Sequence, residues 1–144
     1  MLRKSLIILI CLLSLPALCL AAGEMRLQIK IGDSIVEGAL EDNPVTEQLL
    51  KLTPMTMEMK DYNGQERIGY PPEKLSAKGA RNGLTPSKGD IALFVPWGNL
   101  CVYVKNSTFS DSLVYLGKIT SGLDALASQT VPFKSQWIIS RQGN

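Results

Sequence analysis

The feature that most constrains this chain is a pair of apolar runs, residues 91–95 and 100–104, joined by the connection Pro96-Trp97-Gly98-Asn99. Proline, glycine and asparagine between two β-forming runs predict a tight turn and therefore a β-hairpin. Neither run alternates apolar with polar residues. Both faces of each predicted strand must therefore be covered by other parts of the protein.

The first 22 residues have the layout of a signal peptide. Arg3 and Lys4 precede an apolar run over residues 6–20, and the small residues Ala21 and Ala22 follow it. The run is shorter than the roughly 20 residues that a membrane-spanning helix needs. We therefore expect export to the periplasm or the cell exterior, with no transmembrane span in the mature protein. Lipidation at Cys19 is a disfavoured alternative, because Leu18 is larger than lipoprotein processing usually accepts.

Composition narrows the functional classes of the mature chain. Two of the 15 basic residues, Arg3 and Lys4, lie in the predicted leader. The rest of the chain therefore has 13 basic and 13 acidic residues, and its net charge is zero. A neutral chain without a basic cluster argues against nucleic acid as a partner. Cys101 is the one cysteine outside the leader, so no intramolecular disulfide is expected. The remaining length predicts a single domain, over residues 25–141.

Periodicity predicts further strands and two short helices. Asn43 and Pro44 are typical of a helix start, and Ser121-Gly122-Leu123-Asp124 predicts a capping box at a second helix. Asn63-Gly64 predicts a type I′ turn, and residues 71–88 predict a long surface loop. The other expected strands span residues 25–31, 35–40, 55–61, 66–70, 113–119 and 131–139.

About eight strands in short hairpins with two short helices indicate a mostly β fold. The pattern is typical of a small closed or nearly closed barrel, with the helices plugging or covering it. In such a barrel the inner face of the 91–104 hairpin fills the interior, and its outer face can lie under a helix.

Several blocks resemble cyclophilins. Residues 41–52 are similar to the first helix of cyclophilins, and residues 114–126 to their Phe-Gly-Lys strand, turn and helix. Asp61-Tyr62-Asn63-Gly64, Gly89-Asp90-Ile91 and Pro96-Trp97-Gly98-Asn99-Leu100 together resemble the bacterial cyclophilin-like family of small domains. The resemblance implies a cyclophilin-like closed β-barrel over nearly the whole mature chain.

The resemblance does not carry over the residues of prolyl isomerases. Their histidine stands just before the Phe-Gly-Lys strand, where this chain has Leu113, and the chain contains no histidine. The isomerase arginine also has no recognisable counterpart. We therefore assign no catalytic residue and favour a non-enzymatic role. The alternative is a divergent prolyl isomerase that uses Arg67 or Arg81.

The turn of the central hairpin is the strongest candidate binding site. Core packing explains the two strands but not Trp97, whose indole either packs on the 71–88 loop or forms an exposed binding platform. We expect a small molecule or a peptide segment to bind at the barrel mouth, without a cofactor or a metal. The expected binding residues are Trp97, Asn99, Pro96, Arg67, Tyr62 and Tyr70.

Two sulfur-containing features have structural interpretations. Cys101 lies within an apolar run, where a thiol acts as a small hydrophobic group. Met55, Met57 and Met59 share one face of a strand, which predicts core packing. Cu(I) binding by their thioethers is the alternative. The sequence leaves the ligand and the oligomeric state open.

Overall fold

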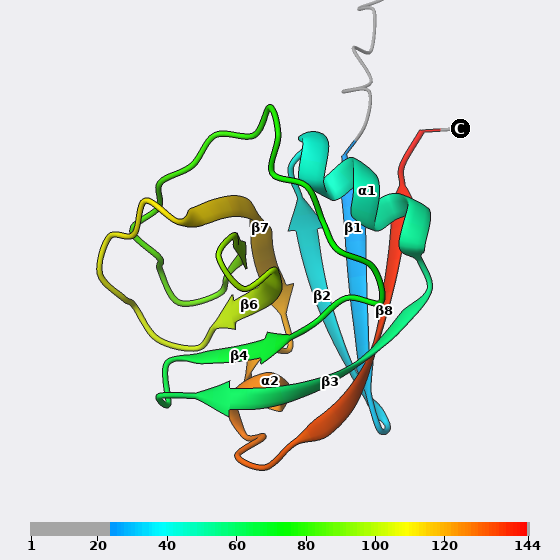
Figure 1. Ribbon diagram of the computed structural model, residues 1–144. Coiled ribbons are helices and arrows are strands. Elements are labelled where there is room, and N and C mark those ends of the chain that lie inside the picture. The colour runs from blue at the N-terminus through cyan, green and yellow to red at the C-terminus, as the bar shows by residue number, and fades with distance from the viewer. Residues whose placement is uncertain (1–23, 144) are drawn as a thin grey trace, which may run out of the picture.

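The computed structural model describes residues 24–143 and shows one closed antiparallel barrel (Figure 1). The strands are β1 (Met25–Ile31), β2 (Ser34–Leu40), β3 (Met55–Tyr62), β4 (Glu66–Gly69), β5 (Asp90–Phe94), β6 (Asn99–Tyr103), β7 (Leu113–Ser121) and β8 (Phe133–Arg141), and the helices are α1 (Pro44–Leu52) and α2 (Leu123–Ala127). Around the barrel the strand order is β1-β2-β7-β5-β6-β4-β3-β8. The predicted barrel of about eight strands with two short helices is confirmed.

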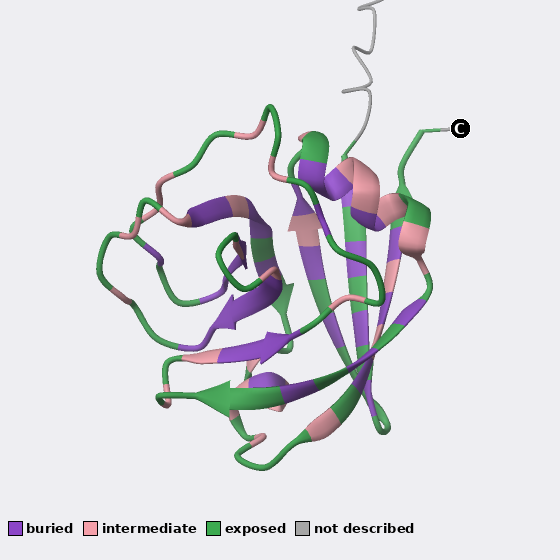
Figure 2. Cartoon of the chain, viewed as in Figure 1, coloured by how far each residue is buried: buried purple, intermediate pink, exposed green. Residues whose placement is uncertain are grey.

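The barrel closes where the first strand meets the last. β1 pairs with β8 from Met25 opposite Arg141 to Lys30 opposite Gln136. Every strand therefore has a neighbour on both sides, and no strand of the described barrel stands at the end of the sheet. The strict alternation of β1 produces alternating buried and exposed residues, which Figure 2 shows along the strand.

The barrel interior holds the main hydrophobic core. Met55, Met57 and Met59 all lie in it, each no more than 3% exposed. Their sulfur atoms are packed among core side chains, so the structure contradicts the copper alternative. Trp137 on β8 is also fully buried there.

The two helices lie at opposite ends of the barrel (Figure 1). Val45 and Leu49 of α1 and Leu126 of α2 belong to the main core. As predicted, Asn43 caps α1: its Oδ1 accepts hydrogen bonds from the backbone N–H groups of Val45 at 2.9 Å and Thr46 at 3.0 Å. Asn43 also donates from Nδ2 to the Tyr115 carbonyl at 3.1 Å, which ties the start of the helix to β7.

Two predictions near the C-terminal half are wrong. Ser121 belongs to β7, and Gly122 caps α2 without a side-chain hydrogen bond, so there is no capping box. A Cβ on Gly122 would come within 2.9 Å of the Ile35 carbonyl oxygen, so close packing against β2 determines this helix start. Val131 lies before β8 and is 67% exposed, because the chain turns into the strand only at Phe133.

The central hairpin is covered on both faces, as its sequence requires. Its strands begin and end one residue earlier than expected, and its inward side chains, such as Leu93 and Leu100, lie in the main core. Its outward side chains Ala92, Cys101 and Tyr103 belong to a second cluster, which we call the outer cluster. The other buried members of this cluster are Ile68 on β4 and Leu113 on β7. Leu84 and Phe94 pack against this cluster. Loop residues therefore contribute to the cover, whereas we expected a helix there.

The signal-peptide prediction concerns residues outside the described part of the chain. The predicted signal peptide, residues 1–22, precedes residue 24, where the description begins. Within residues 24–143, no helix has the length and apolar character needed to cross a membrane.

The Asn43 cap provides a test of the fold. Asn43→Ala removes the hydrogen bonds to the start of α1 and to Tyr115, so we expect a loss of about 1–2 kcal/mol in the free energy of unfolding. Urea denaturation followed by circular dichroism measures it. Asn82→Ala, an exposed asparagine in the loop, is the control and should change stability by less than about 0.5 kcal/mol. Equal effects of the two substitutions would contradict the capping role.

Candidate binding site

The turn between β5 and β6 has a defined geometry. The Gly98 N–H donates to the Phe94 carbonyl at 2.9 Å and closes the turn, and the Val95 N–H donates to the Ser112 carbonyl at 3.0 Å. Gly98 has a φ of 74°, in the left-handed region that favours glycine. The sequence Pro96-Trp97-Gly98 therefore specifies how the backbone presents the indole.

Trp97 lies across the outer wall of the barrel. Its ring contacts Phe94 edge to face at a centroid distance of 5.3 Å and Tyr62 at 5.7 Å. Phe94 is on β5 and Tyr62 on β3, and β6 and β4 lie between these strands. The three rings together therefore bridge the strands between β5 and β3, and the indole at their centre remains 53% exposed. Two aromatic partners thus hold a large ring that is still open to ligand.

A hollow lies on each side of this indole. The first, which we call the Tyr70 hollow, has a volume of about 460 Å³ and is lined by Lys60, Tyr62, Ile68, Tyr70 and Trp97. The second, which we call the Glu66 pocket, has a volume of about 210 Å³. Its lining residues are Tyr62, Glu66, Phe94, Trp97, Tyr103, Ser107, Thr108, Phe109, Ser110 and Leu113. Tyr62 and Trp97 line both, so the two hollows form one groove that the indole divides.

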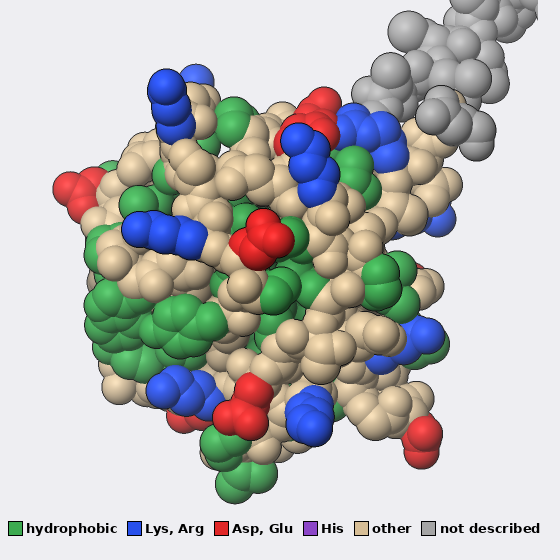
Figure 3. Space-filling model, turned by 45° about the vertical axis from the view of Figure 1, so that its right-hand side comes forward, with side chains coloured by type: hydrophobic (Ala, Val, Ile, Leu, Met, Phe, Trp, Pro, Cys, Tyr) green, Lys and Arg blue, Asp and Glu red, His purple; other side chains and the backbone are tan. Residues whose placement is uncertain are grey.

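The groove is rich in exposed hydrophobic surface. Tyr70 and Phe109 are 53% and 65% exposed. Figure 3 shows hydrophobic side chains gathered at the left of the face that it draws, between Lys or Arg side chains above and below. An apolar concavity with a few polar groups is typical of a ligand site.

Hydrogen bonds between two loops hold the outer wall of the Glu66 pocket. Leu84 and Ser110 exchange backbone hydrogen bonds of 3.0 and 2.9 Å, and the Ser107 N–H donates to the Pro86 carbonyl at 2.9 Å. The segment 107–110 is therefore anchored to the 84–86 segment. The pocket wall is preformed, and it does not depend on a ligand for its shape.

Burial changes the pKa of Glu66, which lines this pocket, and of Cys101, which lies beside it on β6. Glu66 pairs across the sheet with Tyr62 on β3 and with Tyr103 on β6. Burial raises the pKa of the Glu66 carboxyl, while the neighbouring Tyr103 and Cys101 side chains act in the opposite direction. Burial, and then the Glu66 charge, raise the pKa of the Cys101 thiol. Cys101 is therefore a protonated core residue, as its sequence position predicts, and a poor nucleophile.

The structure brings together three of the six expected binding residues. Tyr62, Tyr70 and Trp97 all line the Tyr70 hollow. Pro96 is exposed in the turn but lines neither part of the groove. Asn99 is 1% exposed; its Nδ2 lies 3.4 Å from the Leu100 carbonyl and from Cys101 Sγ, and its Oδ1 has no hydrogen-bond partner within residues 24–143. The groove lies on the outer wall of the barrel and not at its mouth, where we had expected it.

Arg67 has a structural role away from the groove. It is 3% exposed and forms a salt bridge of 2.6 Å from Nη1 to Asp61 Oδ1. It also donates from Nε to the Leu126 carbonyl at 3.1 Å and from Nη2 to the Ala127 carbonyl at 2.8 Å. Its side chain therefore joins the β3–β4 hairpin to the end of α2.

Arg81, the other arginine considered for catalysis, lies in a separate hollow. This hollow is lined by Glu41, Asn43, Arg81, Gly83, Leu84, Val114 and Tyr115. Neither arginine is among the described residues that line the two hollows beside Trp97.

Sequence reasoning missed Glu66, Phe94, Tyr103 and Phe109 as groove residues. A period-two pattern does place Glu66 and Ile68 on one face of β4, with Tyr70 directly after the strand. That β4 lies beside β6, however, follows from a long connection between residues 70 and 89 and not from local sequence. The pairing of Glu66 with Tyr103 therefore needed the structure.

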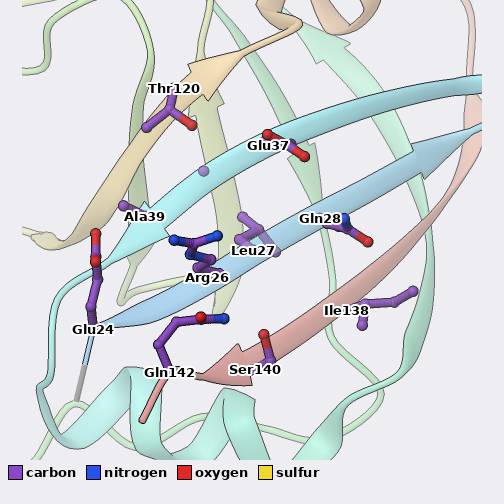
Figure 4. Close-up of a pocket in the computed structure, with 11 residues that line it drawn as sticks. Glu24, Arg26, Leu27, Gln28, Glu37, Ala39, Thr120, Ile138, Ser140 and Gln142 are labelled. Atoms are coloured by element: carbon purple, nitrogen blue, oxygen red, sulfur yellow. The ribbon is translucent and has the colours of Figure 1, made fainter. Parts of the chain in front are cut away.

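A more polar hollow lies on another side of the barrel (Figure 4). It has a volume of about 420 Å³ over β1, β2 and β8, and its polar side chains include Arg26, Gln28, Glu37 and Ser140. All four are exposed. They are the outward residues of strands whose inward residues form the core, so solvation explains their polarity and no group there is held for a ligand.

A closed eight-stranded barrel with a helix at each end, carrying an aromatic groove on its outer wall, defines a cyclophilin-type domain. The model of the Cyclophilin-like family matches residues 29–136, and the chain belongs to this family. The fold is similar to the solution structure of the hypothetical protein AF2241 from Archaeoglobus fulgidus, with a TM-score of 0.66 and 13% identity over 81% of this chain and 95% of that one. A search of curated proteins gave no significant match.

Substitution of the two arginines tests which of them stabilises the fold. Arg67→Met leaves two α2 carbonyls without their donor and should lower the free energy of unfolding by about 2–3 kcal/mol. Arg81→Met, in an exposed loop, should lower it by less than about 0.5 kcal/mol. Urea denaturation measures both. If Arg67→Met proves as stable as the parent protein, the contacts of Arg67 with α2 and Asp61 do not contribute to the free energy of unfolding.

Proposed function

We propose that this protein binds an extended peptide segment with apolar side chains across Trp97, and does not catalyse a reaction on it. The observation that carries the proposal is the half-exposed indole, held edge to face by Tyr62 and Phe94 between two adjoining hollows. Alternate side chains of an extended segment point to the same side, so two of them, at positions i and i+2, can enter the two hollows.

The closed barrel favours recognition through side chains. Many peptide-binding domains add the peptide as a strand to an open sheet edge. Here each strand has a neighbour on both sides in the closed order, so no whole strand of the described barrel lies at a sheet edge. Aromatic side chains give large contact area at a small entropic cost, which suits a preformed groove of this kind.

The groove contents favour binding over isomerisation. Leu113, which stands where the resemblance places the isomerase histidine, lines the Glu66 pocket. Leu113 is thus the link between this pocket and the proline site that the resemblance to prolyl isomerases implies. Neither arginine nor histidine is among the residues that line the two hollows. The one cationic side chain of the groove is Lys60, which lines the Tyr70 hollow and not the Glu66 pocket, so the described lining of the Glu66 pocket offers a bound prolyl bond no cationic donor.

We also propose that the protein acts outside the cytoplasm. The support is the leader-like sequence of residues 1–22, with its basic start, apolar run and small residues before Gly23. Mass spectrometry of the protein recovered after expression with its own N-terminus tests this. The proposal expects a mature chain that begins at Ala22 or Gly23, whereas an intact Met1 on all of the protein would contradict it.

Trp97 supplies the reporter for the binding test. Of the chain's two tryptophans, Trp137 is fully buried and Trp97 is half exposed, so acrylamide should quench mainly Trp97. A peptide acetyl-Ala-Ala-Pro-Phe-amide should protect Trp97 from quenching and shift its emission, because the peptide excludes water from the ring. Trp97→Phe should abolish the signal and leave the Trp137 emission unchanged.

A matched peptide and a second assay complete this test. The peptide acetyl-Ala-Ala-Gly-Gly-amide lacks the apolar side chains and should bind at least about tenfold more weakly, as expected for the loss of two buried side chains. In a protease-coupled assay of an Ala-Pro-Phe peptide, we expect no acceleration over uncatalysed isomerisation, which takes tens to hundreds of seconds. Saturable turnover would replace the binding role with the isomerase alternative.

A further inference from the structure

We infer that the Glu66 pocket binds an organic ammonium group, the chemistry shared by a lysine side chain and a small quaternary amine. The inference rests on the proposed peptide groove and names what enters one half of it. It is argued from the charge, the aromatic walls and the size of this pocket.

The charge in the pocket has one sign. Of the described residues that line it, Glu66 is the one with a charged side chain. On the other side of the indole, Lys60 is the one charged residue that lines the Tyr70 hollow. The two halves of the groove are therefore opposite in charge, and a cation is favoured on the Glu66 side alone.

The walls of the pocket suit a cation with apolar substituents. Tyr62, Trp97, Tyr103 and Phe109 surround the space beside Glu66. The faces of such rings attract an ammonium ion within about 6 Å, and tryptophan does so most strongly. A carboxylate among several aromatic rings satisfies an organic cation in two ways, by its full charge and by the ring quadrupoles.

The size of the pocket indicates a head group. Its volume of about 210 Å³ is below the roughly 300–1,000 Å³ of sites that enclose a drug-sized molecule. It therefore admits an ammonium group with its nearest carbon atoms, while the rest of the ligand extends over Trp97. Because the wall residues 107–110 are anchored by backbone hydrogen bonds, this shape exists before binding.

Glu66 also predicts how affinity changes with pH. Tyr103 and Cys101 on β6 and Tyr62 on β3 are the titratable groups that face it from the neighbouring strands. Burial raises the pKa of the carboxyl, so below this raised value the pocket is neutral and a cation gains little. As the pH rises through the raised pKa the charge forms, and the affinity for a cation should increase.

The test compares two ligands of nearly identical shape. Choline carries a trimethylammonium group, and 3,3-dimethylbutan-1-ol replaces its nitrogen by carbon. Both are titrated against Trp97 fluorescence, and we expect choline to bind roughly three- to thirtyfold more tightly than the neutral analogue. Glu66→Gln should reduce this preference to the part that the aromatic rings supply and remove its pH dependence, while leaving the affinity for the neutral analogue unchanged. Lys60→Gln, on the other side of the indole, is the matched control and should not weaken choline binding.

A second pair of ligands distinguishes the two sources of the cation. The peptides acetyl-Ala-Pro-Phe-Lys-amide and acetyl-Ala-Pro-Phe-norleucine-amide differ in the terminal ammonium group. Preference for the lysine peptide over both its norleucine analogue and choline identifies a basic peptide, and preference for choline identifies a quaternary amine. Phe109→Ala should weaken either cation, since Phe109 lines the Glu66 pocket and not the Tyr70 hollow.

The outcomes separate this inference from the proposed function. If the charged and neutral members of each pair bind equally, or if Glu66→Gln has no effect, the ammonium inference is overturned while the apolar groove stands. If neither cation binds but acetyl-Ala-Ala-Pro-Phe-amide does, the result is the same. If none of the peptides changes the quenching of Trp97, the proposed groove itself is overturned.

Discussion

Burial of the β5–β6 hairpin on both faces is the constraint on which the rest of the structure depends. Leu93 and Leu100 point into the barrel core, whereas Ala92 and Cys101 point outward into the outer cluster. Ordinary barrel strands leave their outer face to water, so an apolar outer face requires a cover. The cover comes from Leu84 of the loop and Phe94 at the end of β5, with the Trp97 ring packed against Phe94 and Tyr62. The candidate site exists because this cover is incomplete.

Trp97 has two physical roles that conflict. As part of the cover, it shields apolar side chains from water, and complete burial would serve that role best. It is nevertheless 53% exposed and has a hollow on each side. Its edge-to-face contacts with Tyr62 and Phe94 offset part of the cost, since such pairs stabilise by about 0.5–1.5 kcal/mol beyond their buried area. Full burial of the ring would stabilise the protein further. Such unrealised stability is common at binding surfaces.

The features that were predictable from sequence are those that nearby residues determine. The alternation of β1, the Asn43 cap and the Asn63-Gly64 turn, in which both residues have positive φ, depend on a few neighbours in sequence. Other features depend on distant segments. Arg67 is buried because carbonyls about 60 residues later accept its hydrogen bonds. Gly122 begins α2 because β2 leaves no space for a side chain. Trp97 was predictable as the centre of the site, whereas Glu66 and Tyr103 become its neighbours only through the strand order.

The position of Leu113 shows how one barrel can retain a groove while its chemistry changes. Leu113 is 3% exposed, belongs to the outer cluster and lines the Glu66 pocket. A histidine there would place a polar ring on an apolar floor, where it costs free energy unless it is hydrogen-bonded. Leucine adds to the apolar floor and leaves Glu66 as the pocket's charged group. The barrel core does not depend on this choice, because the inward side chains of the same strands form a separate cluster. The outward residues that line the candidate groove can therefore change without repacking the barrel.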